Sequence, residues 1–183
     1  SKANKFFELY PNRPIIFLHN TTGYMVGSQY EHAGMIKHGA KMIQAVMNVK
    51  VPKIALYIGA SFGAGNYGMC GYSYRPDFLL TWPNAQTGVM GGQQAAKTME
   101  HVLRNSAARK GKEIDEDSFS SQIIGIQEHF DSQSDAFITS GRLIDHGMID
   151  PRDTRKVLGF CLITCLESKI RKLRPNNFGI ARM

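Results

Sequence analysis

The chain has 183 residues and a net charge of +7, and 43% of its residues are hydrophobic against 20% charged, which is ordinary for one globular domain. Its longest apolar helical run, Val157–Leu166, is far shorter than the about 18 residues that cross a bilayer, and no signal peptide or membrane anchor is visible. The cations are scattered and do not alternate with aromatic residues, so we expect no membrane and no nucleic acid as a partner.

The pattern of hydrophobic residues predicts strands and helices that alternate along the chain. Such spacings are typical of a single α/β domain with right-handed crossovers. In chain order we expect the end of a helix at Lys2–Tyr10, a strand at Pro14–His19, a helix at Tyr30–Met47, a strand at Lys53–Ile58, a helix that begins near Gly65, strands at Phe78–Trp82 and Gly88–Met90, and helices at Gln93–Arg109, Ser118–Phe130 and Asp153–Glu167, with Lys110–Asp117 as a loop or exposed helix start.

Glycine-rich turns follow three of the predicted strands, at Gly23–Gly27, Gly59–Gly65 and Gly88–Gly92. Glycine permits positive φ and lets a ligand approach the main chain closely. If these turns share one edge of the sheet, they form one pocket, in which backbone N–H groups rather than side chains face the ligand.

The segment Lys53–Gly71 is the richest of the three and fits three kinds of site. Gly63-Ala64-Gly65-Asn66-Tyr67-Gly68 has the spacing of a dinucleotide-binding loop. Gly59-Ala60-Ser61-Phe62-Gly63 has the spacing of the nucleophile elbow of a serine hydrolase. In the third interpretation, two successive amides at the start of a helix form an oxyanion hole.

The rest of the sequence gives little support to the first two interpretations. A dinucleotide site needs an acidic residue about 20 positions further on, and residues 83–94 contain none. A hydrolase needs an acid and a histidine downstream, for which Asp135, Asp145, His129 and His146 are the nominal choices. The spacing alone does not decide among the three.

Other reactive side chains favour structural roles. Cys70, Cys161 and Cys165 form no metal-binding or disulfide pattern, which indicates a reducing compartment, and we expect no bound metal. No residue near in sequence orients a histidine as an acid or base, so we expect His19, His101 and His146 to be structural or exposed, and Arg142 and Arg155 to form ion pairs within the domain or to contact coenzyme A or a partner subunit.

Five segments together resemble the C-terminal half of biotin-dependent acyl-CoA carboxyltransferases, most of all those that act on methylcrotonyl-CoA. The similar segments are NTTGYMVG at 20–27, GASFGAGNYGMCG at 59–71, WPNAQTGVMGGQQAA at 82–96, IDHGMIDPRDTR at 144–155 and the ending FGIARM. The resemblance covers almost the whole chain. It implies a crotonase-like fold, a superhelix of ββα units, with residues 1–183 as the second, biotin-side domain and the first domain outside this chain.

The same resemblance implies a function for the glycine turns. Family members transfer CO2 from carboxybiotin, held on a separate carrier domain, to an acyl-CoA. The amides of Ala64 and Gly65 are then the oxyanion hole for biotin, with the rest of the pocket formed by Gly23, Tyr24, Gly27, Phe62, Gly63, Val89, Met90, Gly91 and Gly92. Negative charge develops on the ureido oxygen and the released biotin is itself a base, so this chemistry needs no side-chain base.

Partners and compartment follow from the resemblance as well. It implies an acyl-CoA substrate, a biotin carboxylase and carrier subunit, the first domain of a neighbouring subunit and a homo-oligomer, in the mitochondrial matrix of a eukaryote or the cytoplasm of a bacterium. The chain departs from close relatives at Thr21, Tyr24 and Gln93, where they commonly have Ile, Phe and Glu. Because Gln93 removes a charge beside the expected pocket, geranyl-CoA or another branched acyl-CoA is an alternative to 3-methylcrotonyl-CoA.

Overall fold

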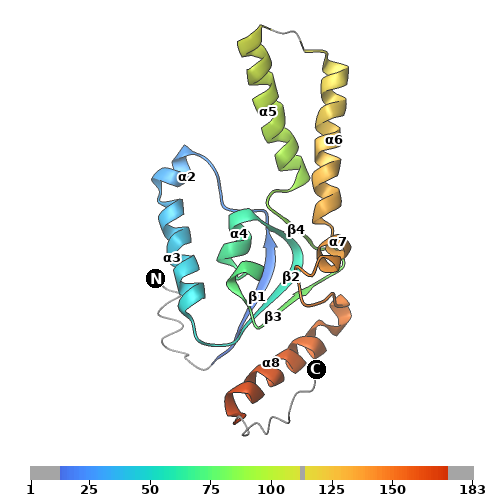
Figure 1. The fold of residues 1–183 in the computed structure, drawn as a ribbon. Coiled ribbons are helices and arrows are strands. Elements are labelled where there is room, and N and C mark those ends of the chain that lie inside the picture. Colours follow the sequence, from blue (N-terminus) through green and yellow to red (C-terminus); the bar gives the residue numbers. More distant parts are fainter. Residues whose placement is uncertain (1–12, 112–113, 173–183) are drawn as a thin grey trace, which may run out of the picture.

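The computed structural model describes residues 13–111 and 114–172 (Figure 1). The helix expected at Lys2–Tyr10 and the FGIARM ending lie outside the described residues. Within them, a small sheet lies between helices on both faces, and a pair of long helices projects away from it. No helix in the described part of the chain is long and apolar enough to cross a membrane.

The sheet is built around one long strand, β2 (Lys53–Phe62). Strand β1 (Ile15–Thr21) pairs with it on one side, in parallel, with Ile16 opposite Ile54. On the other side the first half of β2 pairs with β3 (Phe78–Thr81) and its second half with β4 (Gln86–Gly88), both also in parallel. The expected α/β architecture with parallel strands is therefore confirmed.

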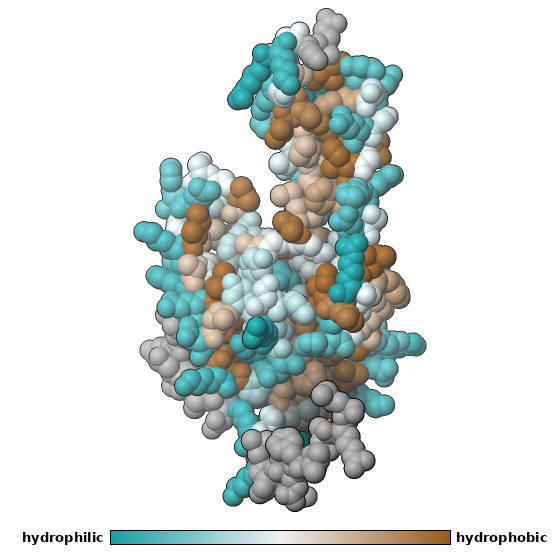
Figure 2. All heavy atoms as spheres, viewed as in Figure 1, coloured by the Kyte–Doolittle hydropathy of each residue, from teal (hydrophilic) through white to brown (hydrophobic). Residues whose placement is uncertain are grey.

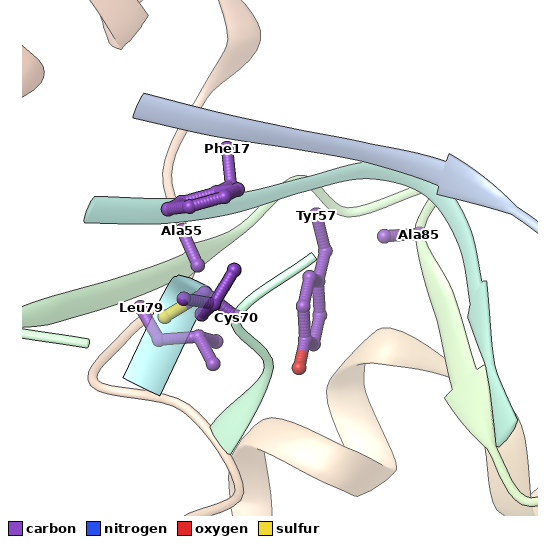
Figure 3. Close-up of a cluster of buried hydrophobic side chains, with 7 residues drawn as sticks. Phe17, Ala55, Tyr57, Cys70, Leu79 and Ala85 are labelled. Carbon is purple, nitrogen blue, oxygen red and sulfur yellow. The ribbon is translucent and has the colours of Figure 1, made fainter. Parts of the chain in front are cut away.

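Two clusters of buried side chains, one on each face of β2, hold the helices to the sheet. Because side chains alternate across a strand, Ala55 and Tyr57 face one cluster and Ile54 and Leu56 the other. The first cluster packs under α3 (Met35–Asn48) and α4 (Gly63–Gly68), with the members Phe17, Val46, Ala55, Tyr57, Cys70, Leu79 and Ala85 (Figure 3). The second contains Leu80 and Cys161 and packs against α8 (Thr154–Ile170).

Most predicted helices are present, with two differences. The predicted helix Tyr30–Met47 is divided into α2 (Ser28–His32) and α3, because Gly34 between them adopts a left-handed conformation with φ of 87°. The helices α5 (Gly92–Lys110) and α6 (Glu116–Ser134) form the projecting hairpin. A short helix, α7 (Ala136–Gly141), follows α6 and was not predicted.

The central strand is longer than predicted. Its predicted end at Ile58 is wrong, because the strand continues to Phe62: Ser61 pairs with Thr21 of β1, and residues 60–62 pair with β4. Glycine is needed at 59 for packing rather than for a turn, since a Cβ there would lie 2.7 Å from Oδ1 of Asn20. The last strand lies at Gln86–Gly88 and not at Gly88–Met90.

The contact between α3 and α4 yields a test of glycine packing. The Tyr24 ring lies between these helices, and a Cβ at Gly39 of α3 would approach its Cε2 to 2.5 Å. We expect Gly39→Ala to lower the free energy of unfolding by about 1–3 kcal/mol through overpacking. Gly125→Ala in α6 is the matched control, because nothing lies within 4 Å of that site; there alanine should raise stability by about 0.5–1 kcal/mol.

Urea denaturation of the two variants beside the parent chain measures this difference. Equal stability of Gly39→Ala and Gly125→Ala would show that the tyrosine ring does not fill the space beside Gly39.

Candidate functional site

The site begins where β2 passes directly into α4. Gly63 is the first residue of α4 and has a left-handed φ of 52°. A Cβ on Gly63 would lie 2.9 Å from the carbonyl oxygen of Val89, in the segment after β4. Both the conformation and the close approach require glycine. As a result, the first turn of α4 lies directly against the loop between β4 and α5.

A cavity of about 580 Å³ opens beside this contact. This volume is in the range of small-molecule sites. Its walls come from the first turn of α4, the loop after β4, the end of α6 and α7, and they include Tyr57, Gly63, Ala64, Asn66, Thr87, Val89, Met90, Gln133, Thr139 and Arg142. Arg142 is the one charged residue among the described residues that line it.

The backbone N–H groups of Ala64 and Gly65 are available for a ligand. Neither amide donates a hydrogen bond to another described residue. The first N–H groups of a helix have no partner within the helix. Ala64 is exposed and lines the cavity, whereas Gly65 is buried.

Buried polar side chains lie under the same turn. Nδ2 of Asn66 donates to both Oη of Tyr57 and Oγ of Ser61, each at 2.8 Å. The Ser61 hydroxyl also bonds Nδ1 of His19 at 2.8 Å. His19 and Ser61 have no exposed surface and Tyr57 has 1%. The sequence analysis did not identify Tyr57 and Asn66 as site residues. The one available signal was Asn66 itself, the single amide side chain in the glycine-rich segment Gly63–Gly68.

These positions do not form a serine hydrolase site. Ser61 lies within β2, not on a sharp exposed turn, and no substrate can reach its hydroxyl. The nominal acids and bases have other partners. Asp145 accepts from the Ser140 hydroxyl and the Gly147 amide, and His146 accepts from the Leu79 amide. Asp135 accepts from the Phe137 amide at the start of α7, and His129 bonds the Gln133 side chain on α6. The expectation that His19 is structural agrees with its burial, although its partner lies 42 residues away in sequence.

Comparison with known proteins identifies the family. The carboxyl transferase domain matches residues 1–180. The chain belongs to this family. It is 48% identical to a probable biotin-dependent acyl-coenzyme A carboxylase beta2 subunit of Mycobacterium tuberculosis and 46% identical to the mitochondrial methylcrotonoyl-CoA carboxylase beta chain of Arabidopsis thaliana, each alignment covering 100% of this chain but only 34% and 31% of the relative.

A solved structure shows the same fold. The beta subunit of geranyl-CoA carboxylase from P. aeruginosa superposes with a TM-score of 0.86 and 45% identity, over 100% of this chain and 34% of that one. The expected crotonase-like fold and the resemblance to biotin-dependent acyl-CoA carboxyltransferases are thereby confirmed. The chain spans about a third of the length of the relatives it matches.

Within this carboxyl transferase domain, the structure brings four of the predicted site residues together. Gly63, Ala64, Val89 and Met90 all line the larger cavity. Val89 is 85% exposed, so its side chain is open to a ligand or to another chain.

Two others, Gly65 and Tyr24, line a separate cavity of about 290 Å³, which also contains Thr21. Gly23 lies beside Gly65, since a Cβ on Gly65 would be 3.0 Å from the Cα of Gly23. The expected site residues thus occupy two cavities rather than one.

The remaining four lie at helix starts or in the core. Gly27 and Gly91 immediately precede α2 and α5. Phe62 is 4% exposed and precedes α4. The Gly92 amide donates to Oδ1 of Asp131 at 3.2 Å, which joins α5 to α6 at the wall of the cavity.

The next features are the two arginines singled out from the sequence and the possible metal ligands. The expectation that Arg142 and Arg155 form ion pairs is wrong, because the ion pairs among the described residues involve Arg104 and Arg152. Arg155 lies apart from the cavity, in an open groove along α8. In the same part of the chain, no three His, Cys, Asp or Glu side chains are grouped as metal ligands, and the three cysteines are free and buried.

Burial makes the floor of the site electrically neutral. It lowers the pKa of His19 from 6.5 to about 4, because the interior penalises the imidazolium form. It also raises the pKa of Tyr57, although the hydrogen bond from Asn66 opposes that shift. Both side chains are therefore uncharged at neutral pH.

The lowered pKa of His19 predicts a pH dependence of stability. The unfolded chain binds a proton below pH 6.5 that the folded chain resists until about pH 4, so the free energy of unfolding falls as pH decreases through this window. The expected loss from this group is about 3 kcal/mol. His19→Gln should remove it, whereas His101→Gln, at an exposed position, should not.

Urea unfolding of the three chains at pH 7 and pH 4 gives this difference directly. An identical pH dependence in His19→Gln and the parent would contradict the neutral, buried state of the imidazole.

Proposed function

We propose that this chain forms the biotin side of a carboxyltransferase site, in which CO2 passes from carboxybiotin to an acyl-CoA. The observation that carries the proposal is the 580 Å³ cavity, at whose wall the first turn of α4 meets the loop after β4. That turn lies in the segment 59–71, whose resemblance to biotin-dependent carboxyltransferases suggested the site, and the chain belongs to the carboxyl transferase family.

The residues present fit biotin. The bicyclic ureido ring is compact and uncharged, and apart from Arg142 the described lining residues are neutral. The Ala64 amide, which has no internal partner, stands at the cavity wall, and the Gly65 amide follows it in the same turn of α4. When bound, carboxybiotin would supply a labile carboxyl group and, once that group has left, a base. Nothing in this arrangement requires a titratable side chain from this domain.

The protein's own contribution is electrostatic. The N–H groups of Ala64 and Gly65 would donate to the ureido oxygen, on which negative charge develops as the carboxyl group leaves. Because these donors belong to the backbone of a packed turn, they need no rearrangement during the reaction. The neutral His19 and Tyr57 below leave this field undisturbed. The other lining residues, Gly63, Val89 and Met90, would shape the wall.

The acyl group we propose is 3-methylcrotonyl, which would give the protein a role in leucine degradation, with geranyl-CoA as the second candidate. Relatives named for each acyl group are almost equally similar, at 46% and 45% identity. Gln93 is exposed on the first turn of α5 and brings no charge to that helix start. Arg142 is placed to contact an anionic group of a ligand at the cavity.

Exposed apolar surface supports the proposal that the chain contacts other proteins as well as the substrate. Hydrophobic side chains lie open on the α5–α6 hairpin and at α7 (Figure 2), among them Val102 at 52%, Ile124 at 57% and Phe137 at 64% exposure. Surfaces of this kind mark interaction sites. We propose that they face the first carboxyltransferase domain of a neighbouring subunit in a homo-oligomer. We propose that this oligomer also binds a biotin carrier and biotin carboxylase subunit. The compartment would be the mitochondrial matrix in a eukaryote and the cytoplasm in a bacterium.

The decisive substitution for the oxyanion hole is Gly65→Val in the full-length protein. A Cβ there would meet Oγ1 of Thr21 at 2.9 Å, so the side chain must displace the first turn of α4. We expect carboxyl transfer to fall by about 10²-fold or more, the loss typical of a displaced oxyanion donor. Ala64→Ser is the matched control, because residue 64 is exposed and keeps its amide.

Transfer would be measured with both methylcrotonyl-CoA and geranyl-CoA, and the ratio of their kcat/KM values identifies the preferred acyl group. Normal transfer by a correctly folded Gly65→Val protein would remove the proposed oxyanion hole.

Another prediction concerns the isolated 183-residue chain. Catalysis requires both reactants within reach, and the acyl-CoA side is proposed to lie on another domain. The isolated 183-residue chain should therefore show no turnover with free biotin and methylcrotonyl-CoA, and should self-associate in sedimentation through its exposed apolar faces. Addition of the first domain should restore activity. Robust turnover by a monomer would refute the shared site, and inactivity even after that addition would favour a non-catalytic oligomerising module.

A further inference from the structure

Helix α4 has almost no side chains with which to hold its position. Its six residues read Gly63-Ala64-Gly65-Asn66-Tyr67-Gly68. Tyr67 is 44% exposed, and its ring contacts Tyr74, at 5.6 Å between centroids, rather than the sheet. Asn66 is thus the one side chain of this helix that bonds the strand below. A helix without an apolar face is held by such bonds and by close backbone contacts.

The Asn66 carboxamide is held at both ends. Its Nδ2 donates to Oη of Tyr57 and to Oγ of Ser61, both on β2 and both at 2.8 Å. Its Oδ1 occupies the space beside the Cα of Gly71, where no Cβ would fit. The Asn66 carbonyl also accepts from the Gly71 amide at 2.9 Å. Side chain and main chain therefore allow α4 a single rotation about its axis.

The strand partners of Asn66 are themselves buried and bonded to the sheet. Ser61 and Tyr57 are buried, and Ser61 bonds His19 of β1 at 2.8 Å. The network therefore joins α4 to two neighbouring strands of the sheet. Inside a protein, hydrogen bonds are stronger than in water, and a buried group such as the Ser61 hydroxyl is costly to leave without its partner.

We propose that Asn66 is a positioning residue of the carboxyltransferase site, and that its carboxamide fixes the rotation of α4 which aims the Ala64 and Gly65 N–H groups at the ligand. This inference rests on the proposed function. Ala64 is two residues before Asn66, so a turn of the helix about its axis redirects its amide. Oxyanion donors lose most of their effect when they are misaimed, and a displacement of about 1 Å reduces rates on the order of 10²-fold.

The first test does not depend on activity. Amide hydrogen exchange would be measured by NMR or mass spectrometry in the parent protein, in Asn66→Ala and in the pair Tyr57→Phe and Ser61→Ala combined. We expect exchange over residues 63–68 to rise about 10-fold or more in Asn66→Ala and in the combined variant, and exchange in α3 to stay unchanged. Unchanged exchange over α4 in both variants would overturn the proposal.

The second test is kinetic and uses the full-length protein. We expect Asn66→Ala to lower kcat for carboxyl transfer about 10- to 100-fold with KM for acyl-CoA within about 2-fold. Tyr57→Phe and Ser61→Ala alone should each have smaller effects, since Asn66 keeps one partner, and together they should match Asn66→Ala. This combined variant carries the test if Asn66→Ala does not fold. A kcat within 2-fold of the parent in either folded variant would overturn the proposal.

The third readout is a pH profile. Asn66→Asp keeps the shape of the side chain. When its carboxyl group is protonated, it is neutral and can donate a hydrogen bond. When it is ionised, it only accepts hydrogen bonds and places a negative charge beside the two amides. We expect kcat of this variant, relative to the parent, to fall as pH rises through the pKa of the new carboxyl group. A flat ratio would contradict the positioning role. An inactive parent would refute the proposed function itself, and the exchange experiment would still decide how Asn66 holds α4.

Discussion

The direct passage of β2 into α4 at Gly63 is the constraint on which the rest of the site depends. The left-handed conformation of Gly63 lets α4 begin directly after the strand, with this residue against the Val89 carbonyl. Any side chain there would force apart the two walls of the cavity. The direction in which α4 leaves the sheet depends on this conformation, which β2 supports by pairing with β4 up to Phe62.

Around that turn, the chain contacts neighbouring segments through the backbone of its glycines. Gly65 lies against Thr21 and Gly23, Gly68 against the Tyr24 ring, and Gly71 against Asn66. Such packing offers little apolar area, so the hydrogen bonds of the half-buried Asn66 with Ser61 and Tyr57 take the place of a hydrophobic anchor. Burial also keeps His19 neutral at physiological pH. The site is therefore preorganised and largely uncharged, which suits chemistry that develops charge on the ligand and not on the protein.

Much of the fold was predictable because local patterns determine it. A continuous apolar run at Ile54–Tyr57 predicts a strand buried on both faces, and the long segments between the turns predict α5, α6 and α8. The glycines of 63–71 indicated a backbone site, and the family resemblance gave it a chemistry that the comparisons support at the level of the carboxyl transferase family. The end of β2 was misplaced, because Gly59 reads as a turn although it serves a close approach to Asn20.

By itself, the sequence determined the α/β class, the order of the principal elements, the family and the position of the glycine-rich turn, since these depend on periodicity and on residue types within one segment. Only the tertiary structure decided that Gly63, Ala64, Val89 and Met90 share one cavity while Gly65 and Tyr24 line another, and that Asn66 bonds Tyr57 and Ser61. The physical reason is that these contacts depend on strand register and on the rotation of α4. Both arise when segments distant in sequence pack together, and no residue spacing in the sequence indicates them.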